Sequence, residues 1–131
     1  VNRPYSDLKK KLEEEKIDTD KLFFVDMITS IAGVNAERTS DCIFMKTPKN
    51  LTDLGIVINE ALSGRNFVLM DSLSTLMLYN ASQNLTQFTQ FLTVRLRSKD
   101  VAGVFLSLEK ETDKELQTIL TQFVDNIIEV D

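Results

Sequence analysis

Short apolar runs alternate with segments of helical periodicity along most of this chain, and the alternation limits what it can fold into. The runs are rich in aromatic and β-branched residues, and none switches cleanly between apolar and polar positions. Continuous runs of this kind are typical of strands that are buried on both faces of a parallel sheet. We expect strands over residues 22–27, 42–45, 67–70, 101–108 and 127–130, with Val1 as the tail of a further strand.

Between these runs lie segments that repeat apolar residues every three or four positions, as amphipathic helices do. They cover residues 5–16, 51–63, 85–98 and 113–124. Asn50 and Asn84 each stand directly before such a segment and are expected to act as helix caps or loop residues. Strand and helix in alternation indicate an open α/β sheet. We therefore expect a single three-layer α/β/α domain over residues 1–131, with a mostly parallel central sheet of about five or six strands.

The segment 28–41 does not follow this alternation. It joins two expected strands and shows no convincing helical pattern. A connection of this length inside a compact domain is either a functional loop or contains a short helix, and the residues leave both alternatives open.

The absence of histidine and the single cysteine, Cys42, exclude several kinds of site. Histidine-based catalytic triads, histidine metal sites and a disulfide within the chain are ruled out. Any metal would be a hard cation such as Mg²⁺, held by carboxylates and hydroxyls. The net charge of −5 at pH 7 argues against a nucleic-acid partner, because nucleic-acid binding needs a basic surface.

The distribution of apolar residues is that of a protein with no membrane partner. No apolar run approaches the roughly 20 residues that are needed to cross a bilayer. The charged N-terminal residues lack the pattern of a signal peptide, so we expect a cytoplasmic location. The first residue is Val1, as in a fragment or a processed form.

Polar residues follow several of the expected strands. Ligands of open α/β sheets gather at the carboxyl ends of the strands, so these residues are the candidates for a binding site. In chain order the candidates are Asn2, Arg3, Asp26, Thr47, Asp71, Ser72, Ser74, Ser107 and Glu109.

Asp71 is the strongest candidate, because four apolar residues followed by an aspartate form the Walker B pattern. In that pattern the carboxylate holds Mg²⁺, usually through water, beside the phosphates of a nucleotide. The pattern is weak by itself, since many buried strands end in an aspartate that only caps the following turn. Asp26 ends a similar apolar run and shows how readily the pattern arises.

The residues around Asp71 carry a resemblance to a known family. Phe67-Val68-Leu69-Met70-Asp71-Ser72-Leu73-Ser74 resembles the Walker B strand and turn of RecA/KaiC-like ATPases. Gly103-Val104-Phe105-Leu106-Ser107-Leu108-Glu109 is similar to the next core strand of that family, and 123–130 is similar to its closing strand. Residues 66–131 carry the resemblance well, whereas residues 1–65 fit more loosely. The chain looks most like the small KaiC-related proteins of archaea that are assigned to signalling.

The resemblance implies a RecA-like core that lacks the family's first strand, phosphate loop and first helix. It assigns Asp71 and Ser72 to the Walker B-like nucleotide site, with Asp71 holding Mg²⁺ through water. It places Asn2, Arg3 and Ser107 on the phosphate side or at a sensor position. Plainer alternatives remain: Arg3 forming an ion pair with Asp7, Asn2 shaping a turn, and Ser107 bonding to backbone.

Two departures from the family pattern argue against catalysis. The phosphate-binding sequence Gly-x-x-x-x-Gly-Lys-Ser/Thr is missing, since the four glycines are scattered. Where the family usually has a catalytic glutamate, this chain reads Asn2-Arg3-Pro4, and asparagine cannot accept a proton from the attacking water. We expect no catalytic residues and no cofactor in the chain as it stands. The expected function is a regulatory, signalling or interaction module that acts with a protein partner or as a homo-oligomer.

Two alternatives stay open. One is an ATP-binding or ATP-hydrolysing KaiC-like protein whose Walker A loop lies upstream of Val1, with Mg-ATP as its cofactor. The other is a flavodoxin-like or receiver-like signalling domain, which would need clustered acidic residues after its first strand. Such a cluster is missing from this sequence.

Overall fold

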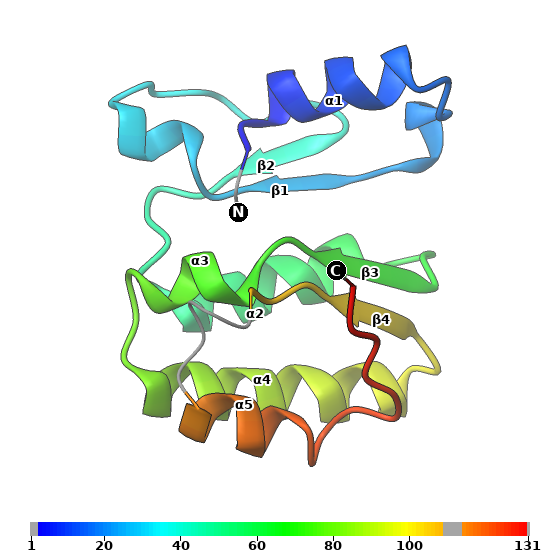
Figure 1. Cartoon of the computed structure of the whole chain (residues 1–131). Coiled ribbons are helices and arrows are strands. Elements are labelled where there is room, and N and C mark those ends of the chain that lie inside the picture. The colour runs from blue at the N-terminus through cyan, green and yellow to red at the C-terminus, as the bar shows by residue number, and fades with distance from the viewer. Residues whose placement is uncertain (1–2, 109–113, 131) are drawn as a thin grey trace. The chain divides into compact units, whose positions relative to one another are not determined.

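The computed structural model of this chain describes residues 3–108 and 114–130. The chain divides into two compact units, unit 1 (Val1–Ser63) and unit 2 (Gly64–Asp131). In Figure 1 the first unit runs from blue to green and the second from green to red.

Unit 1 contains a short parallel sheet with a helix packed on it (Figure 1). Strand β1 (Phe24–Asp26) pairs with β2 (Cys42–Phe44). Tyr5 lies at the start of α1 (Tyr5–Glu14), and its ring packs edge-on against Phe24 and Phe44, with centroid distances of 5.2 and 5.8 Å. The 3-10 helices η1 (Thr19–Lys21) and η2 (Thr29–Ala32) flank β1, and α2 (Leu51–Ala61) ends the unit.

An asparagine side chain caps the N-terminus of helix α2. The Asn50 side chain accepts a hydrogen bond from the Asp53 backbone N–H at 3.0 Å and donates one to the Asp53 carboxylate at 2.7 Å. This confirms the expected capping role of Asn50. Leu54 and Ile58 are buried at a spacing of one helical turn, so α2 has one apolar face directed inward.

Replacing Asn50 with alanine is expected to lower the free energy of unfolding by about 1 kcal/mol, because α2 loses the acceptor for a backbone N–H. Asn84→Ala is the matched control, since Asn84 lies inside a helix and not before it. Urea unfolding followed by far-ultraviolet circular dichroism measures both changes. Equal losses in the two variants would contradict the capping role.

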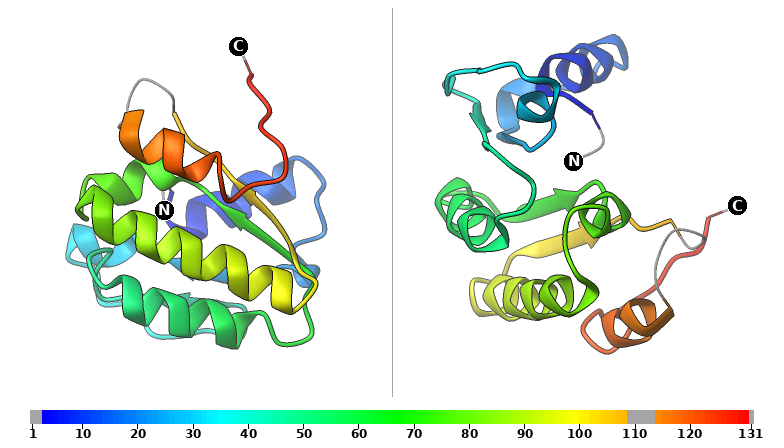
Figure 2. Two further views of the ribbon diagram at one scale, coloured as in Figure 1. Left: turned by 90° about the horizontal axis from the view of Figure 1, so that it is seen from below. Right: turned by 90° about the vertical axis from the view of Figure 1, so that its left-hand side faces the viewer.

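Unit 2 is a parallel strand–helix–strand arrangement. Strand β3 (Phe67–Met70) pairs with β4 (Ala102–Phe105), and α3 (Leu73–Met77) and α4 (Ser82–Ser98) connect the two strands. Helix α4 runs along one face of this sheet (Figure 2). A Cβ atom built on Gly103 would lie 3.0 Å from Leu96 Cδ1 of α4, so glycine allows the sheet and the helix to approach closely.

The end of unit 2 packs on α4. Helix α5 (Lys114–Leu120) contacts α4 and buries Leu116 and Leu120. Arg97 of α4 then holds the following segment, donating hydrogen bonds to the Phe123 carbonyl and to the Asp125 carboxylate, both at 2.9 Å. Residues 126–130 continue beyond this point without regular secondary structure.

The expected three-layer α/β/α domain with a sheet of five or six strands is wrong. In the described parts of the chain, β1 pairs with β2 and β3 pairs with β4, which gives two separate sheets of two strands each. The pairing is parallel, as expected. The error arose from the rule that a continuous apolar run is buried on both faces. In β3, Phe67 and Leu69 remain 54% and 59% exposed, so this run is covered on one face only.

The individual elements lie close to their expected positions, with a few differences. β3 covers the expected residues, while β1, β2 and β4 are shorter than the apolar runs that predicted them. Helix α3 was not predicted, and α4 begins at Ser82, so the capping role of Asn84 is wrong. The segment 28–41 contains η2, and 127–130 is not a strand. Val1 lies outside the described residues.

Candidate functional site

The carboxyl end of β3 leads directly into α3 and places three candidate residues together. Asp71 follows the last residue of the strand and is partly exposed. Ser72 caps α3, because its hydroxyl accepts a hydrogen bond from the Thr75 backbone N–H at 3.3 Å. Ser72 and Ser74 are both buried. Asp71 is therefore the accessible residue of this turn, whereas the two serines are buried.

The carboxyl end of β4 lies beside this turn. The Leu106 backbone N–H donates to the Met70 carbonyl at 3.0 Å, and the Leu73 N–H donates to the Leu106 carbonyl at 2.9 Å. Further along both segments, the Ser74 hydroxyl accepts a hydrogen bond from the Leu108 N–H at 2.7 Å and lies 3.4 Å from the Ser107 hydroxyl. The structure thus brings Asp71, Ser72, Ser74 and Ser107 to one end of the β3–β4 sheet.

The oxygen atoms at this end suit a hard cation but supply few ligands. A carboxylate and neighbouring hydroxyls are the donor types that Mg²⁺ prefers. However, the described residues contain no group of three or more acidic or cysteine side chains that could hold a metal ion. Asp71 would therefore be the main protein ligand of a Mg²⁺ ion that is otherwise bound by water.

No described glycine forms a cradle for nucleotide phosphates. Gly33 and Gly64 adopt positive φ angles of 78° and 73°, and they follow η2 and α2 respectively. Gly55 is buried within α2, and the side-chain space of Gly103 is filled by Leu96. A phosphate loop draws its successive backbone N–H groups from one glycine-rich segment, whereas these glycines are scattered along the chain. The described glycines therefore serve turns, a helix and the packing of a helix on a sheet.

The remaining candidates belong to unit 1 or lie outside the described residues. Arg3 is an exposed residue of unit 1, and no ion pair joins it to Asp7 within the described ranges. The Thr47 hydroxyl accepts a hydrogen bond from the Lys49 N–H at 3.2 Å and so stabilises a turn. Asn2 and Glu109 lie outside the described residues.

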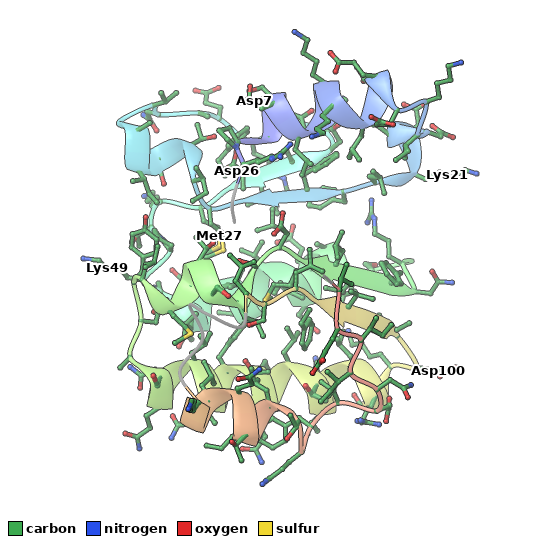
Figure 3. The ribbon with its side chains drawn as sticks, viewed as in Figure 1. Asp7, Lys21, Asp26, Met27, Lys49 and Asp100 are labelled. Carbon is green, nitrogen blue, oxygen red and sulfur yellow. The ribbon has the colours of Figure 1, made fainter. Side chains whose placement is uncertain are left out.

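Asp26 has a structural role, although it ends an apolar run like the one before Asp71. It is buried in unit 1, below the start of α1 (Figure 3). Its carboxylate accepts hydrogen bonds from the N–H groups of Tyr5, Ile28 and Thr29 and from the Thr29 hydroxyl, at 2.6 to 2.9 Å. Burial by itself raises the pKa of Asp26, but these hydrogen bonds outweigh it and lower the pKa below its ordinary value.

A polar cluster on unit 1 was missed by the sequence analysis. Asp41 accepts hydrogen bonds from the Tyr5 hydroxyl at 2.7 Å and from the Lys9 ammonium at 2.8 Å. These bonds lower the pKa of Asp41 to about 2 and raise the pKa of Lys9. Tyr5 and Lys9 are one helical turn apart on α1, and this spacing was the sequence feature that could have indicated half of the cluster. The cluster links α1 to Asp41, the residue before β2, and so has a structural role.

Cys42 does not contribute a reactive thiol. It is fully buried at the start of β2. Burial raises the pKa of its thiol to about 12, so the group stays protonated at neutral pH. The interpretation of Cys42 as a small buried apolar residue is therefore supported by its surroundings.

Comparison with known proteins places the chain in a family. Residues 2–130 match a group described as a family of unknown function, DUF7504. No curated protein and no solved structure matches the chain. Among the described residues, no helix is both long and apolar enough to span a membrane.

Proposed function

The chain belongs to the DUF7504 family, and we propose that it is a non-catalytic interaction or regulatory module related to RecA/KaiC-like ATPases. One observation carries this proposal: among the described residues, Asp71 is the one carboxylate at the carboxyl end of the β3–β4 sheet, and the sequence contains no Gly-x-x-x-x-Gly-Lys-Ser/Thr loop to hold phosphates beside it. The nearby Ser74 hydroxyl is occupied with the Leu108 N–H and the Ser107 hydroxyl. A site that activates water needs a general base in reach of the water, and the serines cannot supply one.

The relationship to RecA/KaiC-like ATPases is supported by the arrangement around Asp71. The residues that resemble the Walker B strand form β3, and those that resemble the next core strand include β4. The two strands pair in parallel and bring Asp71 and Ser107 to the same end. The resemblance therefore concerns residues that are neighbours in space, which favours a shared ancestry for unit 2.

A second candidate function is the binding or hydrolysis of Mg-ATP. It is favoured by the partial exposure of Asp71 at the carboxyl end of a strand, where Mg²⁺ ligands are found in nucleotide-binding proteins. In this case the phosphate loop would have to come from residues that do not belong to this sequence. The mechanism would use Asp71 and Ser72 to position the ion, while the general base would also have to be supplied from elsewhere.

Isothermal titration calorimetry with Mg-ATP separates the two functions. A non-catalytic module is expected to release no heat of binding, because the sequence lacks the Gly-x-x-x-x-Gly-Lys-Ser/Thr loop that holds the phosphates. Binding that is lost in Asp71→Asn but retained in Asp100→Asn would overturn the proposal in favour of nucleotide binding. Asp100 is a suitable control, because it lies before β4 at the other end of the sheet, and its φ of 55° is tolerated by asparagine.

The partner of the proposed module is another protein chain. The net charge of −5 disfavours nucleic acid, which would be repelled by an acidic surface. We place the module in the cytoplasm, where a protein with one buried, unpaired cysteine is stable without disulfides.

A further inference from the structure

Asp26 holds the first residue of α1 and the beginning of segment 28–41 with the same oxygen atom. Its Oδ2 accepts hydrogen bonds from the Tyr5 N–H at 2.7 Å and from the Thr29 hydroxyl at 2.6 Å. Its Oδ1 accepts hydrogen bonds from the N–H groups of Ile28 and Thr29 at 2.7 and 2.9 Å. One carboxylate therefore fixes both the start of α1 and the conformation at the start of η2.

Asp41 repeats this arrangement at the other end of segment 28–41. Its Oδ1 accepts hydrogen bonds from the Tyr5 hydroxyl at 2.7 Å and from the Thr39 hydroxyl at 2.9 Å. Its Oδ2 accepts a hydrogen bond from the Lys9 ammonium at 2.8 Å. The carboxylate that holds the end of the segment is therefore also bound by two residues of α1.

Tyr5 links these two carboxylates across the β1–β2 sheet. Asp26 is the last residue of β1, and Asp41 directly precedes β2. Because the two strands are parallel and in this register, the two aspartates lie toward opposite ends of the sheet. The Tyr5 ring packs edge-on against Phe24 and Phe44, one from each strand. A single residue therefore contacts both strands and both carboxylates.

Helix α1 has little apolar surface with which to hold itself on the sheet. Six of its ten residues are charged, and Leu8 and Leu12 are its only aliphatic side chains. Elements with few apolar contacts open locally before the rest of the structure unfolds. The position of α1 therefore depends strongly on the polar bonds that Tyr5 and Lys9 make.

An opening of α1 affects segment 28–41 because the acceptor atoms are shared. When Tyr5 leaves, water takes its place at Oδ2 of Asp26 and at Oδ1 of Asp41. This water competes with the hydroxyls of Thr29 and Thr39, so their bonds become weaker. The backbone bonds that pair β1 with β2 do not involve Tyr5 and can stay closed.

We propose that Tyr5 couples α1 to segment 28–41, so that α1 and both ends of the segment open together while β1 and β2 stay paired. The coupling is reciprocal, as linkage requires. A molecule that displaces α1 therefore loosens the segment, and one that orders the segment holds α1 in place. This device belongs to unit 1 alone, so its test is independent of the role proposed for Asp71.

Hydrogen–deuterium exchange of the whole chain, followed residue by residue by NMR, tests this coupling in Tyr5→Phe. The change removes the hydroxyl that reaches Asp41 and keeps the ring. The N–H groups of Ile28 and Thr29 bond to Asp26, toward the other end of the sheet. They are expected to exchange roughly fivefold faster, together with the amides of α1, because the variant has lost one hydrogen bond of α1.

Lys9→Met and Lys10→Met form a matched pair for the same measurement. Both remove one positive charge from neighbouring positions of α1, but Lys9 binds Asp41 whereas Lys10 is exposed. Lys9→Met should accelerate exchange at Ile28 and Thr29, and Lys10→Met should leave it unchanged.

Thr29→Val tests the reverse direction, because it removes the hydroxyl that shares Oδ2 of Asp26 with α1. The Leu8 N–H, which donates to the Pro4 carbonyl in the first turn of α1, should then exchange faster. Thr52→Val is the matched control, since Thr52 is an exposed residue of α2. Unchanged exchange of α1 in Thr29→Val would contradict the coupling.

Two results in Tyr5→Phe would overturn the proposal. The first is faster exchange that is confined to α1 and leaves Ile28 and Thr29 unaltered. The second is equal acceleration at the N–H groups of Phe24 and Met45, which donate across the sheet at 2.8 Å, because unit 1 would then open as one body.

Discussion

Replacing Asp26 with alanine is expected to lower the free energy of unfolding of unit 1 by about 3 kcal/mol or more. Asp26 is only 5% exposed, and its carboxylate accepts hydrogen bonds from three backbone N–H groups and one hydroxyl. Its removal leaves these donors without an acceptor in a buried place, where each unsatisfied group costs about 1–3 kcal/mol. One of the donors is the N–H of Tyr5, so the contact between α1 and β1 also loosens.

Urea unfolding at neutral pH measures this loss, with Asp7→Ala as the matched control. Asp7 lies in the first turn of α1 and is exposed, so its removal costs only the small interaction with the helix dipole. The structural role of Asp26 would be refuted if both variants lost the same stability. Asp26→Asn should fall between the two, because an amide keeps one acceptor oxygen but turns a donor toward the other N–H groups.

The stability of unit 1 should also depend on pH through Asp26. Its pKa in the folded chain lies below the ordinary value of 3.8. The ionised carboxylate therefore stabilises the folded state above the ordinary pKa, and this contribution is lost as the pH falls through the lower, folded pKa. Unfolding measured from neutral to acidic pH should show a smaller decrease in Asp26→Ala than in the unaltered chain.

The second large effect is expected from Leu85→Ala, which should destabilise unit 2 by about 3–5 kcal/mol. Leu85 lies in the first turns of α4 and is 0% exposed. Truncation removes the contacts of the side chain and leaves a cavity, because the surrounding strands and helices close over it only in part.

Leu78→Ala provides the matched control for this truncation. Leu78 is 76% exposed, so the same chemical change should alter the free energy of unfolding by less than about 0.5 kcal/mol. Far-ultraviolet circular dichroism in urea compares both variants with the unaltered chain. A loss below about 1 kcal/mol in Leu85→Ala would show that α4 does not form the core of unit 2.

The positions of most helices and strands could be predicted because they depend on local patterns. Apolar residues at helical spacing marked α1, α2, α4 and α5, and the cap at Asn50 follows from the hydrogen bonds of its own first turn. Helix α3 escaped prediction because it has only five residues, too few to show a period. The cap at Asn84 failed since α4 starts at Ser82, before the apolar repeat becomes visible.

The candidate site was predictable in part for a geometric reason. Strands that pair in parallel end on the same side, so Asp71 and Ser107 were expected to meet, and in unit 2 they lie at the same end of the sheet. The roles of the two aspartates were not predictable from their apolar runs. The Asp26 carboxylate accepts a hydrogen bond from the N–H of Tyr5, which lies 21 positions earlier in the chain. No local sequence pattern reveals this contact.

The sequence by itself determined where β3 and β4 lie and which residues follow β3, since both depend on neighbours in the chain, although it also predicted a strand over 127–130 that is not formed. Asp71 was located in this way, directly after an apolar run that forms β3. Only the tertiary structure decided how many strands pair and which faces are covered. An apolar run has the same amino-acid sequence whether one face of the strand is buried or both are. The exposure of Phe67 and Leu69 is decided by segments that pack beside β3 and lie far away in sequence.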